Sequence, residues 1–148
     1  MTLYQQIEAD RMIAMKASDE LRLSTLRMIS TVMKNAMIAK KGELTDEEVQ
    51  KILRTEVKKR KEAHEAFLKA DYQDKAAQEK TEMAMIEAYL PAQMSDQDLE
   101  QLVSKTLQAA NMSEPSQFGQ AMGVVMKELA GQADGAKVQS LIKKILNT

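Results

Sequence analysis

The chain has 148 residues, which is enough for one ordinary domain or two small ones. Its 21 basic and 22 acidic residues leave a formal net charge of -1, so no overall field draws it to nucleic acid or a membrane surface. The absence of cysteine excludes disulfides, thiolate nucleophiles and cysteine metal sites, and it fits a reducing compartment. The first residues show no signal-peptide pattern, and no apolar run approaches the roughly 18 residues of a membrane span. We therefore expect a cytoplasmic protein without a membrane partner.

The composition predicts an all-α fold. Aromatic residues make up 3% of the chain, with five glycines and two prolines, while alanine, leucine, methionine, lysine, glutamate and glutamine dominate. These are strong helix formers, whereas strands are enriched in aromatic and β-branched residues. The twelve methionines are expected to fill gaps in the core, and a methionine-rich binding surface is the alternative.

Two helices are predicted in the N-terminal part by apolar residues at helical spacing. The first covers residues 2–16, with Leu3, Ile7 and Met15 facing inward. The second covers residues 19–40.

The next two helices are expected to form a long antiparallel hairpin. One covers residues 46–69 and begins with a capping box made by Thr45 and Glu48. The other covers residues 72–90 and stops before Pro91, because the residue preceding a proline is biased away from helix. The short turn between them places their apolar stripes face to face.

Charged and titratable residues lie on the apolar side of this hairpin. Residues equally distant from a turn near Ala70 should face each other, which brings Arg60 opposite Glu79. We predict an Arg60–Glu79 ion pair that fixes the register of the hairpin, with a catalytic use of the pair as the alternative. The single histidine, His64, lies at the edge of the same stripe and is expected to be a hydrogen-bonded interface residue rather than a metal ligand.

The segment after Pro91 marks a boundary between two predicted domains. Residues 1–92 form an N-terminal four-helix domain, and residues 95–148 form a small C-terminal three-helix domain. The helices of the second domain are expected over residues 96–110, 114–130 and 136–146. Ser95 and Asp134 are suited to cap the first and last of them, and Asn111 can end the first in a left-handed conformation.

No catalytic constellation is present in the sequence. There is no nucleophile elbow with its histidine and acid, no glycine-rich phosphate loop after a strand, and no spacing that selects a general acid and base. We expect no catalytic residue, no metal and no cofactor.

Two basic surfaces are candidates for binding. On the third helix, Arg54, Lys58 and Lys61 lie on the exposed side, where phosphate contacts would give salt-dependent, sequence-tolerant affinity. A solvated helix face is the alternative, and no aromatic residue interleaves this patch to stack on unpaired bases.

The second candidate surface lies in the C-terminal domain. Gly119 and Gly123 are four residues apart on one side of a helix, where each costs about 1 kcal/mol relative to alanine. Either another helix or the backbone of a ligand should approach closely there. Gly131 and Gly135 are explained as helix ends. Four lysines add positive charge nearby: Lys127, Lys137, Lys143 and Lys144.

Several motifs resemble the GatB/YqeY-domain family in order and spacing. They are Arg60-Lys61, Tyr89-Leu90-Pro91, Phe118 to Lys127, Gly131 to Gly135, Val138 and Leu146. The resemblance spans nearly the whole chain, so the chain as a whole is similar to a stand-alone YqeY-like protein. It implies an all-α protein with an N-terminal helical domain and a C-terminal three-helix domain.

The resemblance also implies a function. In larger relatives the same module is the tail of the B subunit of the glutamine-dependent tRNA amidotransferase, a carbon–nitrogen ligase with glutamine as amido-N-donor. The tail is associated with tRNA recognition, and catalysis belongs to a preceding domain that this chain lacks. A non-catalytic module that binds tRNA or tRNA-handling proteins is therefore expected. DNA is not expected to be a partner. A protein–protein adaptor and an accessory of the ligase are alternatives. In the family that the chain resembles, a basic residue usually occupies the position of Gln132. The glutamine in this chain departs from that pattern and weakens the inference of RNA binding.

Overall fold

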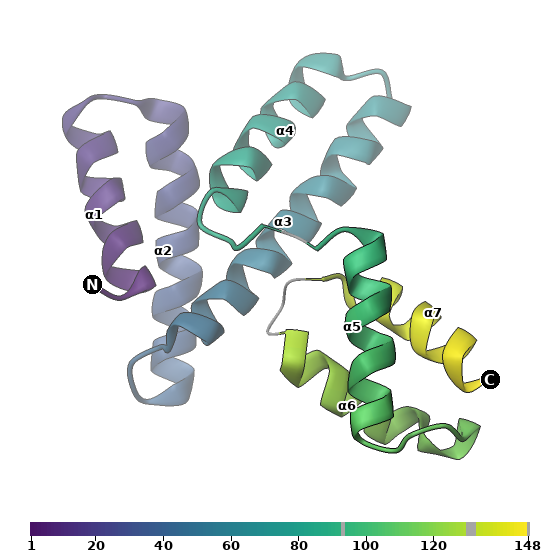
Figure 1. The fold of residues 1–148 in the computed structure, drawn as a ribbon. Helices are drawn as coiled ribbons and strands as arrows, with labels where there is room; N and C mark the ends of the chain where they lie inside the picture. The colour runs from purple at the N-terminus through teal and green to yellow at the C-terminus, as the bar shows by residue number, and fades with distance from the viewer. Residues whose placement is uncertain (93, 130–132, 148) are drawn as a thin grey trace. The chain divides into compact units, whose positions relative to one another are not determined.

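The computed structural model describes residues 1–92, 94–129 and 133–147, and these contain α-helices and one 3₁₀ turn but no strand. The all-α prediction is confirmed. Backbone contacts divide the chain into two compact units, Met1–Pro91 and Ala92–Thr148 (Figure 1). The first unit contains α1 (Leu3–Lys16), α2 (Glu20–Lys40), α3 (Asp46–Lys69) and α4 (Gln73–Glu87). The second contains α5 (Asp96–Ala109), the 3₁₀ turn η1 (Pro115–Gln117), α6 (Phe118–Leu129) and α7 (Gly135–Leu146).

Side-chain caps set the starts of the helices where the sequence predicts them. Thr45 and Glu48 form the predicted capping box at α3. The side chains of Ser95 and Asp134 accept backbone hydrogen bonds at the starts of α5 and α7. Asn111 has a φ of 54° just after α5, as expected of a left-handed helix end.

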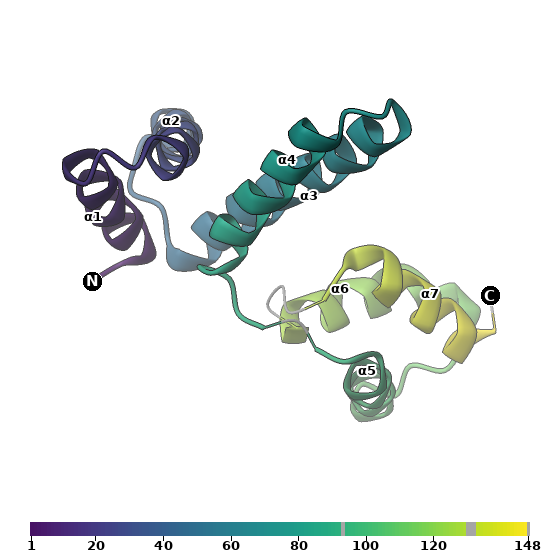
Figure 2. The same cartoon turned by 90° about the horizontal axis from the view of Figure 1, so that it is seen from above.

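The core of the first unit is built from all four helices at one end of the hairpin. Buried residues of α1 and α2 pack against the first half of α3 and the end of α4, and Val49, Leu53 and Ile86 are their partners in the hairpin. Beyond this core, α3 and α4 continue side by side to their connecting turn (Figures 1 and 2).

One predicted core position in α1 is wrong. Met15 is 40% exposed, and Ala14 is buried in its place. Ala14 follows Ile7 by seven residues, or nearly two full turns, so both lie on one stripe, whereas Met15 is rotated a further 100°. Leu3 is half-buried against the same core, as predicted.

The second unit has its own core, made by one apolar stripe from each of α5, α6 and α7 and by one residue of the segment before α7. The buried residues are Leu99, Val103, Leu107, Ala121, Val125, Leu129, Ala133, Val138, Ile142 and Leu146. The helix α6 begins at Phe118, later than predicted, because the segment from Pro115 forms a separate 3₁₀ turn.

Candidate nucleic-acid interface

The helix α7 is the most one-sidedly charged element of the second unit. It carries three lysines, Lys137, Lys143 and Lys144, and no acidic residue. Its apolar stripe of Val138, Ile142 and Leu146 is buried, so the polar residues are turned outward and all three lysines are exposed. The result is a local positive surface on a chain that is nearly neutral as a whole.

The three lysines flank the buried stripe of α7 on two sides. The ammonium of Lys137 lies 3.1 Å from a carboxylate oxygen of Asp96 at the start of α5. Both groups are well exposed, so this pair adds little stability. Lys144 follows Lys137 by seven residues and lies on the same side of α7. The ammonium of Lys143 lies on the other side, 5.9 Å from the centre of the Phe118 ring.

The residues that follow Phe118 include an exposed stripe of α6. Gly119, Gly123 and Lys127 follow one another at four-residue spacing and are all exposed. A Cβ built on Gly119 or Gly123 would meet no atom of the described residues within 4 Å. The expectation that another helix covers these glycines is therefore wrong for the described structure. The approach of an external ligand backbone remains as the other interpretation.

The residues of the predicted basic face on α3 are not equally exposed. Lys58 and Lys61 are exposed, as expected. Arg54 is only half-exposed, and burial lowers the pKa of its guanidinium. Arg54 is thus less exposed than predicted.

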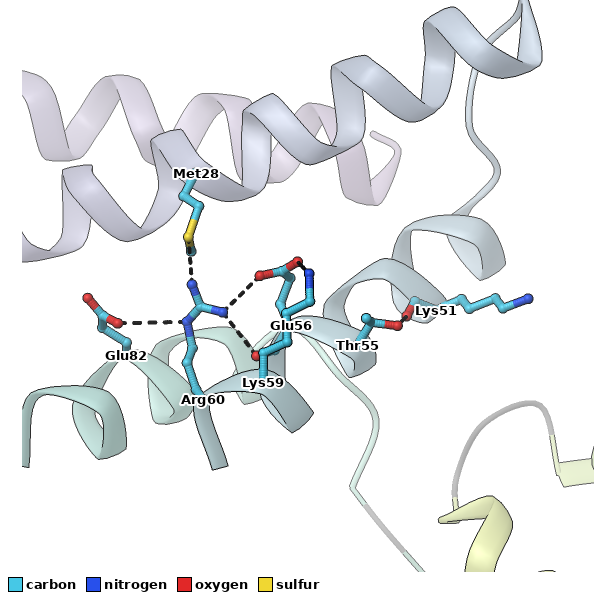
Figure 3. Close-up of polar contacts among 7 residues, drawn as sticks. All are labelled: Met28, Lys51, Thr55, Glu56, Lys59, Arg60 and Glu82. Atoms are coloured by element: carbon cyan, nitrogen blue, oxygen red, sulfur yellow. Dashed lines mark hydrogen bonds and ion pairs between the residues drawn. The ribbon is translucent and has the colours of Figure 1, made fainter. Parts of the chain in front are cut away.

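The predicted Arg60–Glu79 pair is wrong in its acidic partner. Arg60 is 6% exposed, and its Nη1 lies 2.8 Å from a carboxylate oxygen of Glu56 on the same helix. Its Nε lies 3.7 Å from a carboxylate oxygen of Glu82 across the hairpin, and its Nη2 donates to the sulfur of Met28 on α2 (Figure 3). The guanidinium therefore joins α2, α3 and α4.

The position of the turn explains the change of partner. The turn is centred on Asp71, which has a φ of 62°, rather than on Ala70. Arg60 precedes Asp71 by as many residues as Glu82 follows it, so these two residues face each other. Glu79 is not ion-paired with Arg60, and burial raises the pKa of its carboxyl, with a further increase from neighbouring Glu82 and a partial decrease from Arg60.

The single histidine, His64, has a structural role in the hairpin. The Nδ1 atom of His64 lies 2.7 Å from the carbonyl oxygen of Ala76, so it donates across the hairpin. This confirms the predicted interface histidine. Within the described residues, no group of three or more histidine, cysteine or acidic side chains is placed to hold a metal ion.

The turn of the hairpin carries exposed residues that the sequence reasoning missed. Tyr72 is 55% exposed, and its ring meets that of Phe67 edge to face at a centroid distance of 6.4 Å. The ammonium of Lys75 lies 5.1 Å from the centre of the Tyr72 ring. The signal in the sequence that could have pointed to these residues is the scarcity of aromatic side chains, since the chain has only two phenylalanines and three tyrosines.

Gly131 and Gln132 lie outside the described residues. None of the helices described is both long enough and apolar enough to cross a bilayer.

Comparison with known proteins identifies the family. A protein of Pyrenophora tritici-repentis (strain Pt-1C-BFP), named Altered inheritance of mitochondria protein 41, mitochondrial, is 24% identical over 145 residues, which are 95% of this chain and 79% of that protein. That name places the relative in mitochondria, and a cytoplasmic location for this chain stays a prediction. The sequence profile described as Yqey-like protein matches residues 4–146. Because this match covers almost the entire chain, the protein belongs to the YqeY-like family.

Proposed function

We propose that this protein is a non-catalytic helical module that binds tRNA through its C-terminal unit. The observation that carries the proposal is the positive surface of α7, with three exposed lysines and no acidic residue. The resemblance to the tail of the tRNA amidotransferase B subunit supports tRNA as the nucleic acid. Amidotransferase chemistry is not proposed for this chain by itself.

The lysines provide affinity through the phosphate backbone. An exposed ammonium that replaces a condensed counterion contributes binding without reading the base sequence. Contacts from Lys127, Lys143 and Lys144 to three phosphates predict that affinity falls about 20- to 40-fold between 50 and 200 mM salt. Lys137 adds less, because it is already paired with Asp96.

The glycines of α6 suit the same partner. With no side chains at Gly119 and Gly123, a sugar–phosphate backbone can approach the helix more closely than it could over larger residues. Lys127 continues this stripe, and Lys143 lies beside Phe118, the residue before Gly119. The glycine stripe of α6 would allow close approach of the RNA, and the exposed lysines of α6 and α7 would supply the positive charge.

Charge reversal tests the proposal. The variant K127E/K143E/K144E should abolish tRNA binding in a filter or fluorescence-anisotropy titration at low salt, because repulsion replaces three attractive contacts. The matched control is R27E/K80E/K105E, which changes the net charge by the same amount at exposed positions within other helices. The control should keep most of the affinity.

Two results would overturn the proposal. One is equal loss of binding in both triple variants, which would mean that net charge alone matters. The other is the absence of tRNA binding by the wild-type protein at low salt. Circular dichroism of each variant would verify that the helices are intact.

A protein–protein adaptor is the second candidate. It is favoured by an exposed apolar group at the end of α1, where Met12 and Met15 are each 40% exposed and Ile13 is 63% exposed. The partner would then be a tRNA-handling protein or another protein. Copurification of a partner that survives RNase treatment and is lost in I13E would support this function over direct RNA binding.

A further inference from the structure

The turn between α3 and α4 exposes an aromatic cluster, which consists of Phe67, Leu68, Tyr72 and Lys75. Tyr72 is 55% exposed and Leu68 is 51% exposed. The two rings meet at an interplanar angle of 89°, and the Lys75 ammonium lies 5.1 Å from the Tyr72 ring centre and 5.8 Å from that of Phe67. Two of the five aromatic residues of the chain are thus placed at one turn.

The fold of the first unit does not require an aromatic ring at position 72. The core that joins α1 and α2 to the hairpin lies at the other end of α3 and α4, remote from this turn (Figures 1 and 2). The turn itself is closed by backbone geometry, with Asp71 at a φ of 62° and the Tyr72 amide donating to the Phe67 carbonyl.

Tyr72 is also an unfavourable choice for local helix stability. It occupies the N-cap position of α4, and its side chain makes no capping hydrogen bond in the described structure. Serine, threonine, aspartate or asparagine at this position would normally accept a hydrogen bond from the first turn. A tyrosine here replaces a better cap and places an aromatic ring in solvent.

Exposed lysines also lie on α3, the helix that precedes this cluster. Lys51, Lys58 and Lys61 are exposed and, with Leu68, follow one another at spacings of seven, three and seven residues, which puts them on one side of the helix. No aromatic residue lies within this basic face, and Tyr72 follows α3 in the turn before α4. Glu62 and Glu65 are exposed acids on that side, Asp71 lies in the turn, and Asp74 is accounted for by the first turn of α4, where a carboxylate is favourable.

We propose that the aromatic cluster is a stacking site for an unpaired nucleobase of single-stranded RNA, with Tyr72 as the platform. Lys75, whose ammonium lies beside both rings, can contact a flanking phosphate. An exposed aromatic ring beside cations is the combination by which proteins bind single strands without strong sequence preference. The proposal extends the proposed function and rests on RNA being a ligand of this chain. It adds that the RNA must present an unpaired base.

The test uses a short, unstructured RNA oligonucleotide that contains one 2-aminopurine, together with the full-length protein. Stacking quenches the fluorescence of this base, and wild type and Y72F should both quench it, because both keep an aromatic face. Y72L keeps an apolar side chain but has no π-face, so it should lose the quenching and bind about 5- to 150-fold more weakly. Unfolding curves should be nearly the same for all three proteins, since the position is exposed.

Other outcomes decide against the stacking site. Equal binding by Y72L and wild type would overturn it. No binding of the oligonucleotide by wild type at low salt would overturn it as well.

The triple variant of the C-terminal unit separates this proposal from the proposed function. If K127E/K143E/K144E loses tRNA while Y72L behaves as wild type with both RNAs, the stacking site fails and tRNA binding by the C-terminal unit stands. If the triple variant binds tRNA normally while Y72L loses the quenching, the C-terminal interface fails and the stacking site stands.

Discussion

Arg60 and Glu56 are charged residues at positions where an all-helical core normally has apolar ones. They are 6% and 3% exposed, and they are paired with each other. The desolvation of two buried charges offsets most of their attraction, so such a pair adds little net stability. Its effect is positional, because the guanidinium also reaches Glu82 and Met28 on neighbouring helices (Figure 3).

The first prediction concerns the loss of one partner. R60M should destabilise the protein by about 3 kcal/mol or more, because it leaves Glu56 buried without its main partner. The double variant E56L/R60M should be more stable than R60M, since both charges are then absent. Urea unfolding measures both. K58M, a change of an exposed lysine on the same helix, serves as the control, and its effect should stay within about 0.5 kcal/mol.

Tyr89 provides a second prediction, on pH. Its hydroxyl donates to a carboxylate oxygen of Asp10 at 2.5 Å, and burial together with this bond raises the pKa of Tyr89 from 10.0 to about 12. The folded state therefore holds the proton more tightly than the unfolded state. The stabilisation is fully present below pH 10 and is lost as the pH rises toward 12.

The comparison of wild type with Y89F isolates this contribution from other titrating groups. Y89F should be less stable by about 1 kcal/mol at pH 8, a value reduced from that of a fully buried bond because the side chain is half-buried. The difference should shrink between pH 10 and 12. Tyrosinate absorbance of the wild type should contain a late-titrating component that is absent from Y89F. A difference independent of pH would contradict the assignment.

At the scale of elements, local sequence signals were sufficient to predict where the helices lie. They were not sufficient to predict which residues of different helices contact each other. The capping box at Thr45 and Glu48 locates the start of α3, since caps depend only on nearby residues. The partner of Arg60 depends on the centre of the turn, and a shift from Ala70 to Asp71 changes it from Glu79 to Glu82. The open surface over Gly119 could not be predicted, because spacing alone does not show what packs on a face.

The helix α6 yields the third prediction. G119A and G123A should each stabilise the protein by about 0.5–1 kcal/mol, because alanine is a better helix former and the added methyl group meets no described atom within 4 Å. Urea unfolding checks the gain, and Q120A, an exposed substitution in the same helix, should have almost no effect. A loss of stability in either glycine variant would show that something covers these positions after all.

At the scale of the whole molecule, the chain contains two separate apolar cores. The buried residues of one come from α1 to α4, and those of the other come from α5 to α7 and the segment before α7. The division falls between Pro91 and Ala92, and a helix-disfavouring proline at the end of the first unit fits this position. Each core is closed by helices of its own unit, so each unit has the packing needed to fold by itself.

The last prediction follows from these separate cores. Fragments 1–91 and 92–148, produced separately, should both show helical circular dichroism and a cooperative urea transition. The second fragment should unfold at lower urea, because a shorter chain buries a smaller fraction of its surface. The full chain provides the control, and its unfolding should contain both transitions. If fragment 92–148 remained unfolded alone but became helical when mixed with fragment 1–91, its core would depend on contacts with the first unit, and the independence of the two units would be wrong.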